Sequence, residues 1–183
     1  GIVNAGFSGL LWSPEVRHAI DVEDLVRRLQ TGVFSPQTLV NAWYISSPPW
    51  LQYNRQKNLD GEFLENHEEV EEICRKIFEV RMKFVPYLYS SYAKYCFEGI
   101  PVFRALVVDY ATDANTYDID DEYMMGDSLL VAPVIRGESS RDVYLPEGNW
   151  YCYWTNHKYE GGQKYTVEVP LEWIRSEEHT SEL

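Results

Sequence analysis

Hydrophobic and polar residues alternate with two different periods in the first part of the chain. Ser8–Trp12 is a short apolar run before Ser13 and Pro14, which predicts a buried strand that leads into a loop. After Asp21, apolar residues recur at spacings of three and four and predict a capped amphipathic helix that ends at Gly32. Leu39–Tyr44 predicts a second strand. Strand, helix and strand in this order indicate an α/β unit with parallel strands.

A longer helical pattern follows a polar excursion. The proline-rich stretch from 46 to 62 predicts a long surface loop, and apolar residues between 65 and 99 then fall on one helical face. Glutamates four residues before a basic residue support this helix at Glu71–Arg75, Glu72–Lys76 and Glu79–Lys83. Pro86 predicts a kink or a split into two helices.

The pattern changes to short strands and turns from Ile100 onward. Segments rich in β-branched and aromatic residues predict strands at Val102–Tyr110, Ser128–Ile135, Asp142–Leu145, Trp150–Trp154 and Tyr165–Val169. Turn residues at 146–149 and 160–162 separate several of them. This order predicts an antiparallel β-sandwich and a domain boundary near Gly99.

Composition and charge narrow the class of protein. The 183 residues contain 16 Lys and Arg against 29 Asp and Glu, a formal net charge of −13. This balance argues against a nucleic-acid partner, and the sequence has no run of about 18 apolar residues that would span a membrane. The 14 Tyr, 7 Phe and 6 Trp suit sugar rings as well as they suit a core. Cys74, Cys96 and Cys152 show no metal-ligand spacing and favour a reducing, cytoplasmic compartment.

The last nine residues differ from the rest of the chain. Residues 175–183 are polar, lack periodicity and resemble the translation of a sequencing-library adapter. We therefore leave them out of the fold prediction. A natural acidic tail is the alternative.

Five segments in order resemble glycoside hydrolase family 31, the retaining α-glucosidases, α-xylosidases and their relatives. They are GFSG at 6–9, RRLQTGVFSP at 27–36, RMKFVPYLY at 81–89, YMMGDSLLVAPV at 123–134 and VYLPEGNW at 143–150. The resemblance implies that residues 1–99 are the C-terminal part of a (β/α)8 TIM barrel and that residues 100–174 begin a β-sandwich domain. It also implies an oligosaccharide or α-glycoside substrate, no cofactor and no metal, with a homo-oligomeric full-length enzyme as a possibility.

The family chemistry uses two aspartates, and both precede the region that this chain resembles. The resemblance therefore implies that the 183 residues hold no catalytic carboxylate and are inactive alone. It places Glu15 where relatives carry an aspartate and Asn41 where they carry a histidine. Glu15 either lines the sugar pocket or holds a loop, and the Asn41 amide can donate to and accept from sugar hydroxyls.

Further residues are candidates for substrate binding. Arg17 either reaches substrate or pairs with Glu15, and for His18 the structural role is favoured. Trp43 and Trp50 either stack on a sugar or pack in the protein. The alternative function is a non-catalytic carbohydrate-binding or scaffold module that uses these tryptophans with Trp150 and Trp154.

The acidic residues between Asp113 and Glu122 superficially suggest calcium. However, the sixth position of an EF-hand loop would be Asp118, where glycine is required. We interpret the run as a solvated connection between strands.

Overall fold

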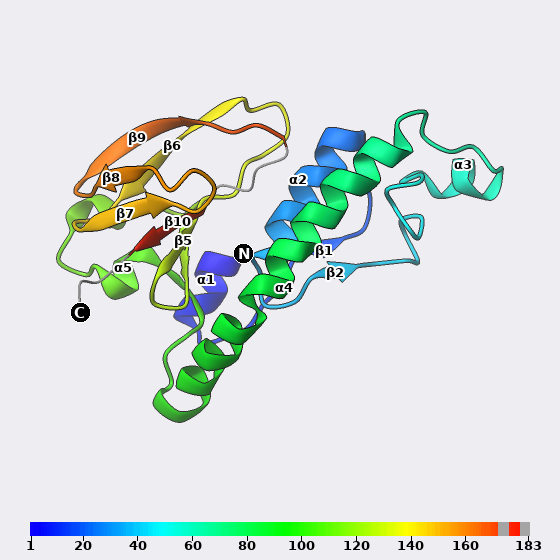
Figure 1. Cartoon of the computed structure of the whole chain (residues 1–183). Helices are drawn as coiled ribbons and strands as arrows, with labels where there is room; N and C mark the ends of the chain where they lie inside the picture. The colour runs from blue at the N-terminus through cyan, green and yellow to red at the C-terminus, as the bar shows by residue number, and fades with distance from the viewer. Residues whose placement is uncertain (172–175, 180–183) are drawn as a thin grey trace.

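The computed structural model describes residues 1–171 and 176–179, and its elements form two connected parts (Figure 1). The elements of the first part are α1 (Ile2–Phe7), β1 (Glu15–Val16), α2 (Val22–Val33), β2 (Leu39–Val40), α3 (Arg55–Leu59) and α4 (His67–Glu98). The elements of the second part are β3 (Phe103–Ala105), α5 (Leu106–Asp109), the 3-10 helix η1 (Ala114–Thr116), β4 (Tyr123–Met125), β5 (Leu129–Val131), β6 (Ser140–Leu145), β7 (Asn149–Cys152), β8 (Lys158–Glu160), β9 (Gln163–Glu168) and β10 (Ser176–His179).

Helices α2 and α4 pack against each other in the first part. Asp21 caps α2 by accepting a hydrogen bond from Asp24 N at 2.9 Å, and α2 continues through Gly32, slightly past its expected end. Helix α4 contains Pro86 within one continuous helix, so the predicted split is wrong. It ends at Gly99, whose φ of 75° is the left-handed conformation that glycine adopts without a steric penalty.

The two strands of the first part are parallel and short. Residues 15 and 16 of β1 pair with 39 and 40 of β2. The strand predicted at Ser8–Trp12 is wrong, because these residues follow α1 as a turn and irregular backbone. Only Leu39 and Val40 of the expected strand Leu39–Tyr44 are in β2, because the chain turns at Asn41.

The second part has two β layers. A six-stranded antiparallel sheet has the order β3-β4-β5-β10-β7-β8, and β6 pairs with β9 as a separate antiparallel ribbon. Met124, Leu130 and Trp150 of the large sheet share a buried cluster with residues of β6 and β9. The arrangement is rich in sheet and is consistent with a β-sandwich.

The expected strands are present in part. The segments predicted at 128–135, 142–145, 150–154 and 165–169 overlap β5, β6, β7 and β9. The segment predicted at Val102–Tyr110 is β3 followed by the helical turn α5, and the sequence analysis missed β4 and β8. It also left residues 175–183 outside the fold, whereas the structure has Ser176–His179 as β10 between β5 and β7. Residues 175 and 180–183 lie outside the described residues.

Helix α2 is held by loops of the second part. Arg136 forms an ion pair with Asp21 at 2.5 Å, so the capping residue also binds the sheet domain. Gly137 N donates to Glu23 Oε1 at 2.9 Å in the same first turn. Further along α2, the buried Arg27 donates to Val169 O at 2.7 Å.

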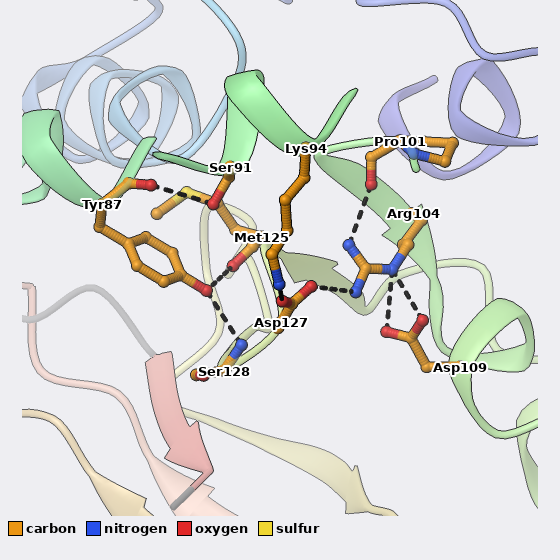
Figure 2. A network of polar contacts seen from close by, with 9 residues as sticks. All are labelled: Tyr87, Ser91, Lys94, Pro101, Arg104, Asp109, Met125, Asp127 and Ser128. Atoms are coloured by element: carbon orange, nitrogen blue, oxygen red, sulfur yellow. Dashed lines mark hydrogen bonds and ion pairs between the residues drawn. The ribbon is translucent and has the colours of Figure 1, made fainter. Parts of the chain in front are cut away.

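Helix α4 holds the turn between β4 and β5 (Figure 2). The Tyr87 hydroxyl donates to Met125 O at 2.8 Å and accepts from Ser128 N at 2.9 Å. Lys94 of the same helix pairs with Asp127. Asp127 also accepts from the buried Arg104 at 3.0 Å. The turn is therefore fixed to the helix by both neutral hydrogen bonds and ion pairs.

Arg104 completes this network from strand β3. Its Nε donates to both carboxylate oxygens of Asp109 at 2.8 and 2.9 Å, and its Nη1 donates to Pro101 O at 2.9 Å. The Arg104 side chain is 4% exposed, and its guanidinium contacts two carboxylates and a carbonyl. A buried guanidinium is tolerated when its donors are paired in this way.

Candidate functional site

Glu15 and Asn41 meet where the parallel strands β1 and β2 end. Asn41 follows β2 directly, and its backbone N donates to Val16 O at 2.9 Å, which extends the pairing of the two strands. Its side-chain Nδ2 donates to Glu15 Oε1 at 2.5 Å. Two of the residues expected at the sugar pocket are therefore in direct contact.

Arg17 contacts the other oxygen of the same carboxylate. Its Nε lies 2.5 Å from Glu15 Oε2, and its guanidinium lies over the Tyr44 ring, 5.3 Å from the centroid. The hydrogen bond from Arg17, assisted by that from Asn41, holds the pKa of Glu15 below its usual value despite some burial. Glu15 is thus an ionised acceptor. Arg17 is 58% exposed and His18 is exposed as well.

The amide of Asn41 has a fixed orientation. Its Oδ1 accepts from Trp43 N at 3.0 Å, while its Nδ2 donates to Glu15. An amide nitrogen carries two hydrogens, and in the described part of the chain the second one has no protein acceptor. Arg55 of α3 donates to the carbonyl of Trp43. The Trp43 side chain is 81% exposed, so the turn presents an uncovered indole beside the polar cluster.

Trp50 belongs to a different surface. Its ring packs edge-on against Phe78 of α4 with centroids 6.1 Å apart, and it borders the buried cluster that contains Val70 and Cys74. It also lines an open hollow of about 370 Å³ with Met82 and other residues of α4. The structure therefore brings together Glu15, Arg17, Asn41 and the Trp43 backbone, and it places Trp50 against the helix.

Comparisons with known proteins identify the family. Residues 99–177 match the model described as the glycosyl hydrolase family 31 C-terminal domain. The chain belongs to glycoside hydrolase family 31. It is 34% identical over 177 residues to alpha-glucosidase 2 of Bacillus thermoamyloliquefaciens, covering 94% of this chain and 21% of that protein. It is 33% identical over 171 residues to an alpha-xylosidase of Saccharolobus solfataricus, covering 92% of this chain and 21% of the relative.

Solved structures agree with this assignment. A Flavobacterium johnsoniae family 31 dextranase in complex with isomaltotriose superposes with a TM-score of 0.81 and 31% identity. The match covers 97% of this chain and 22% of the dextranase. The family 31 chain described here thus spans about a fifth of the length of these relatives.

Glu122 is an unusual residue that the sequence analysis missed. It is 3% exposed, its Oε1 accepts from Tyr144 N at 3.0 Å, and its Oε2 has no hydrogen-bond partner among the residues that the structure describes. Burial raises the pKa of this carboxyl to about 7. The interpretation of residues 113–122 as a solvated connection is therefore wrong for Glu122. Its position directly before the apolar run of β4 was the available signal.

Two other acidic residues of that run have protein partners. Asp113 accepts from the Tyr144 hydroxyl at 2.5 Å, and Asp121 pairs with Arg141 at 2.8 Å. Within the described part of this family 31 chain, no group of three or more His, Cys, Asp or Glu residues is placed to hold a metal ion. Across the same residues, no helix has the length and apolar character that crossing a membrane requires.

Proposed function

We propose that this chain is part of a retaining α-glycoside hydrolase and that residues 1–99 are the end of its (β/α)8 barrel. The observation that carries the proposal is the contact between Glu15 and Asn41 at the carboxyl ends of parallel β1 and β2. In (β/α)8 barrels, this end of the strands carries the active site. Helix α2 connects the two strands, as such a barrel requires.

In this proposal the polar cluster of Glu15, Arg17 and Asn41 binds sugar hydroxyls. The ionised Glu15 accepts hydrogen bonds, and the free N–H of the Asn41 amide donates one. Arg17 keeps the carboxylate charged, and the exposed Trp43 supplies an apolar face for a sugar ring. We propose an α-linked oligosaccharide or a simpler α-glycoside as the substrate.

The two catalytic carboxylates are proposed to lie outside the 183 residues. Retaining hydrolysis needs a nucleophile and a proton donor on carboxyl groups about 5 Å apart. Glu15 is a poor proton donor because Arg17 and Asn41 stabilise its ionised form. Its side-chain partners are a guanidinium and an amide, whereas the mechanism requires a second carboxyl group nearby.

The alternative function, a carbohydrate-binding module, requires exposed tryptophans, and the two that lie in the second part of the chain are buried or half-buried. Trp150 is 0% exposed and its indole Nε1 donates to Pro146 O at 2.8 Å. Trp154 is half-buried and packs against Tyr153 with centroids 5.2 Å apart. The Trp150 ring is fully buried and the Trp154 ring is partly covered, so neither is a freely exposed sugar platform and we retain the hydrolase.

A chimera tests the proposal. Residues 1–171 would replace the matched segment of the Bacillus thermoamyloliquefaciens alpha-glucosidase, and hydrolysis of an aryl α-glucoside and an aryl α-xyloside would be measured. We expect an active chimera in which Asn41→Ala lowers kcat/KM at least about tenfold, the loss of roughly one hydrogen bond to substrate. Gln163→Ala, which removes an exposed amide on β9, is the matched control and should stay within about twofold.

Two results would contradict the proposal. If Asn41→Ala and Gln163→Ala have equal effects on kcat/KM, the cluster does not contact the substrate. If the isolated 183-residue chain hydrolyses either glycoside, its own carboxylates perform the chemistry.

A further inference from the structure

Residues 46–62 form a loop that is held by its own hydrogen bonds. Ser46 N donates to Tyr53 O at 3.4 Å, which closes the loop near its base. The buried Gln52 holds the other side, because its Nε2 donates to Glu62 O at 2.8 Å. These bonds give the loop a defined path, so the side chains that it carries have defined targets.

Two side chains of this loop bind backbone carbonyls next to the polar cluster. The Tyr53 hydroxyl donates to Ile20 O at 3.2 Å, on the segment that follows β1. Arg55 donates to Trp43 O, on the turn that follows β2. The loop therefore contacts both segments that continue from the ends of the parallel strands.

Arg55 is the first residue of the short helix α3. Asn54 caps this helix by accepting from Lys57 N at 3.1 Å. None of the five residues of α3 is buried, and the helix lies at the outer edge of the first part (Figure 1). Apolar packing of α3 therefore does not account for its position, whereas the hydrogen bond from Arg55 joins it directly to the turn after β2.

The backbone of Trp43 is held on both sides of its side chain. Its N donates to Asn41 Oδ1 at 3.0 Å, and its carbonyl accepts from Arg55. The side chain itself is 81% exposed, so packing contributes little to the direction of the indole. The two backbone contacts, one of them from the polar cluster, therefore determine where the ring lies.

We propose that Arg55 is a positioning residue that holds the Trp43 indole in place for the substrate, an inference that rests on the proposed function. Without Arg55, the turn loses one of its two contacts, and ordering the indole on binding costs conformational entropy. A stacked aromatic face contacts the sugar ring in the ground state and in the transition state alike. Loss of its order therefore raises KM and leaves kcat nearly unchanged.

Kinetics of the chimera test this role. Arg55→Ala should raise KM for the aryl α-glycoside that the chimera hydrolyses faster by about threefold to tenfold, and kcat should stay within about twofold. Lys57→Ala is the matched control, since it removes the same charge from an exposed position of the same helix, and it should leave both constants within about twofold. An unchanged KM in Arg55→Ala, or a loss confined to kcat, would overturn the proposal.

A double variant separates positioning from an independent contact with the substrate. If Arg55 acts through the indole, adding Arg55→Ala to Trp43→Ala should change KM by less than about twofold, because the ring is already absent. Single effects that multiply in the double variant would show that Arg55 acts without Trp43 and would overturn the proposal. An unchanged KM in Trp43→Ala would overturn it as well.

A spectroscopic measurement on the full 183-residue chain is independent of the proposed function. With 5-fluorotryptophan in place of the six tryptophans, the fluorine NMR signal that disappears in Trp43→Phe belongs to Trp43. Arg55→Ala should shift or narrow this signal and leave the others in place, and Lys57→Ala should change none of them. A Trp43 signal that Arg55→Ala leaves unchanged would overturn the positioning role. If Asn41→Ala has no effect in the chimera while Arg55→Ala still changes the signal, the proposed function alone is overturned.

Discussion

The Tyr87 side chain occupies the space that a side chain on Gly126 would need. A Cβ on Gly126 would lie 2.6 Å from Tyr87 Cζ and 2.7 Å from Ser91 Oγ, both in α4. Gly126 also has a φ of 64°, which L side chains rarely adopt. The turn between β4 and β5 can therefore approach the helix only because this residue is glycine.

Gly126→Ala should destabilise the chain by about 2 to 4 kcal/mol, from backbone strain together with overpacking. Gly137→Ala is the control, since Gly137 has a φ of 87° but open space around its Cβ position. It should cost only the backbone strain, about 1 kcal/mol. Thermal unfolding of both variants measures the difference. Equal losses would mean that the contact with α4 carries no energetic weight.

Arg104→Met should be destabilising. The substitution removes the guanidinium that binds Asp109 and Asp127, and it removes the donor to Pro101 O. The carboxylates left behind are 27% and 46% exposed and Asp127 keeps Lys94, so water and Lys94 offset part of the loss, which should be about 1 to 3 kcal/mol. Arg75→Met is the control, because Arg75 is 58% exposed and pairs with Glu71 on the surface of α4. Its effect should stay within about 0.5 kcal/mol, as measured by denaturant unfolding.

Glu122 should make stability fall as the pH rises from about 4.5 to about 7. Burial raises its pKa from 4.5 to about 7 in the folded chain, so in this range the folded state keeps a proton that the unfolded state has released. Above pH 7, ionisation of Glu122 therefore lowers the free energy of unfolding by about 3 kcal/mol relative to its value at low pH. Asp121, Arg141, Lys164 and the Tyr144 amide face the group and contribute to its pKa.

Glu122→Gln isolates this contribution. The variant should match the parent chain near pH 4.5 and should be more stable above pH 7, when both are unfolded by urea at a series of pH values. Exposed Glu160→Gln is the control for loss of one charge. A difference between Glu122→Gln and the parent that does not change with pH would contradict the raised pKa.

Trp43 and Trp50 should respond differently to truncation. Trp43→Ala should change the free energy of unfolding by less than about 0.5 kcal/mol, because its side chain is 81% exposed. Trp50→Ala should cost about 2 to 3 kcal/mol, because it removes the ring that packs on Phe78. Denaturant unfolding followed by circular dichroism measures both. In the chimera, only Trp43→Ala should weaken substrate binding with stability unchanged, and the opposite pattern would exclude Trp43 from the site.

Local signals predicted the two long helices, α2 and α4, but not the short helices α1, α3 and α5. The cap at Asp21 and the end of α4 at Gly99 depend on residues within one turn, so their sequence is sufficient. Of the kink or split predicted at Pro86, the split is wrong, because a long packed helix tolerates the loss of one backbone hydrogen bond. The apolar run at Ser8–Trp12 also misled the prediction. Leu10 and Leu11 of that run are exposed, and the Trp12 ring, also exposed, lies against Gly1.

Tertiary relationships were harder to predict. The contact between Glu15 and Asn41 joins residues 26 positions apart, and periodicity alone does not reveal it. Trp50 is on a loop, and its sequence is compatible both with stacking on a sugar and with packing on a helix. The contact with Phe78 of α4 decides between these two roles. Strand β10 was missed because its residues are polar, whereas its pairing uses backbone groups that every sequence has.

The link between α2 and the end of the chain has a consequence for biosynthesis. The carbonyl of Val169 that Arg27 binds is synthesised 142 residues after the arginine itself. At a translation rate of about 5 to 20 residues per second, this is a delay of about 7 to 30 seconds. Throughout that interval α2 lacks the carbonyl that binds its central guanidinium in the folded chain. This contact of α2 therefore forms only after β9 and the residue that follows it have left the ribosome.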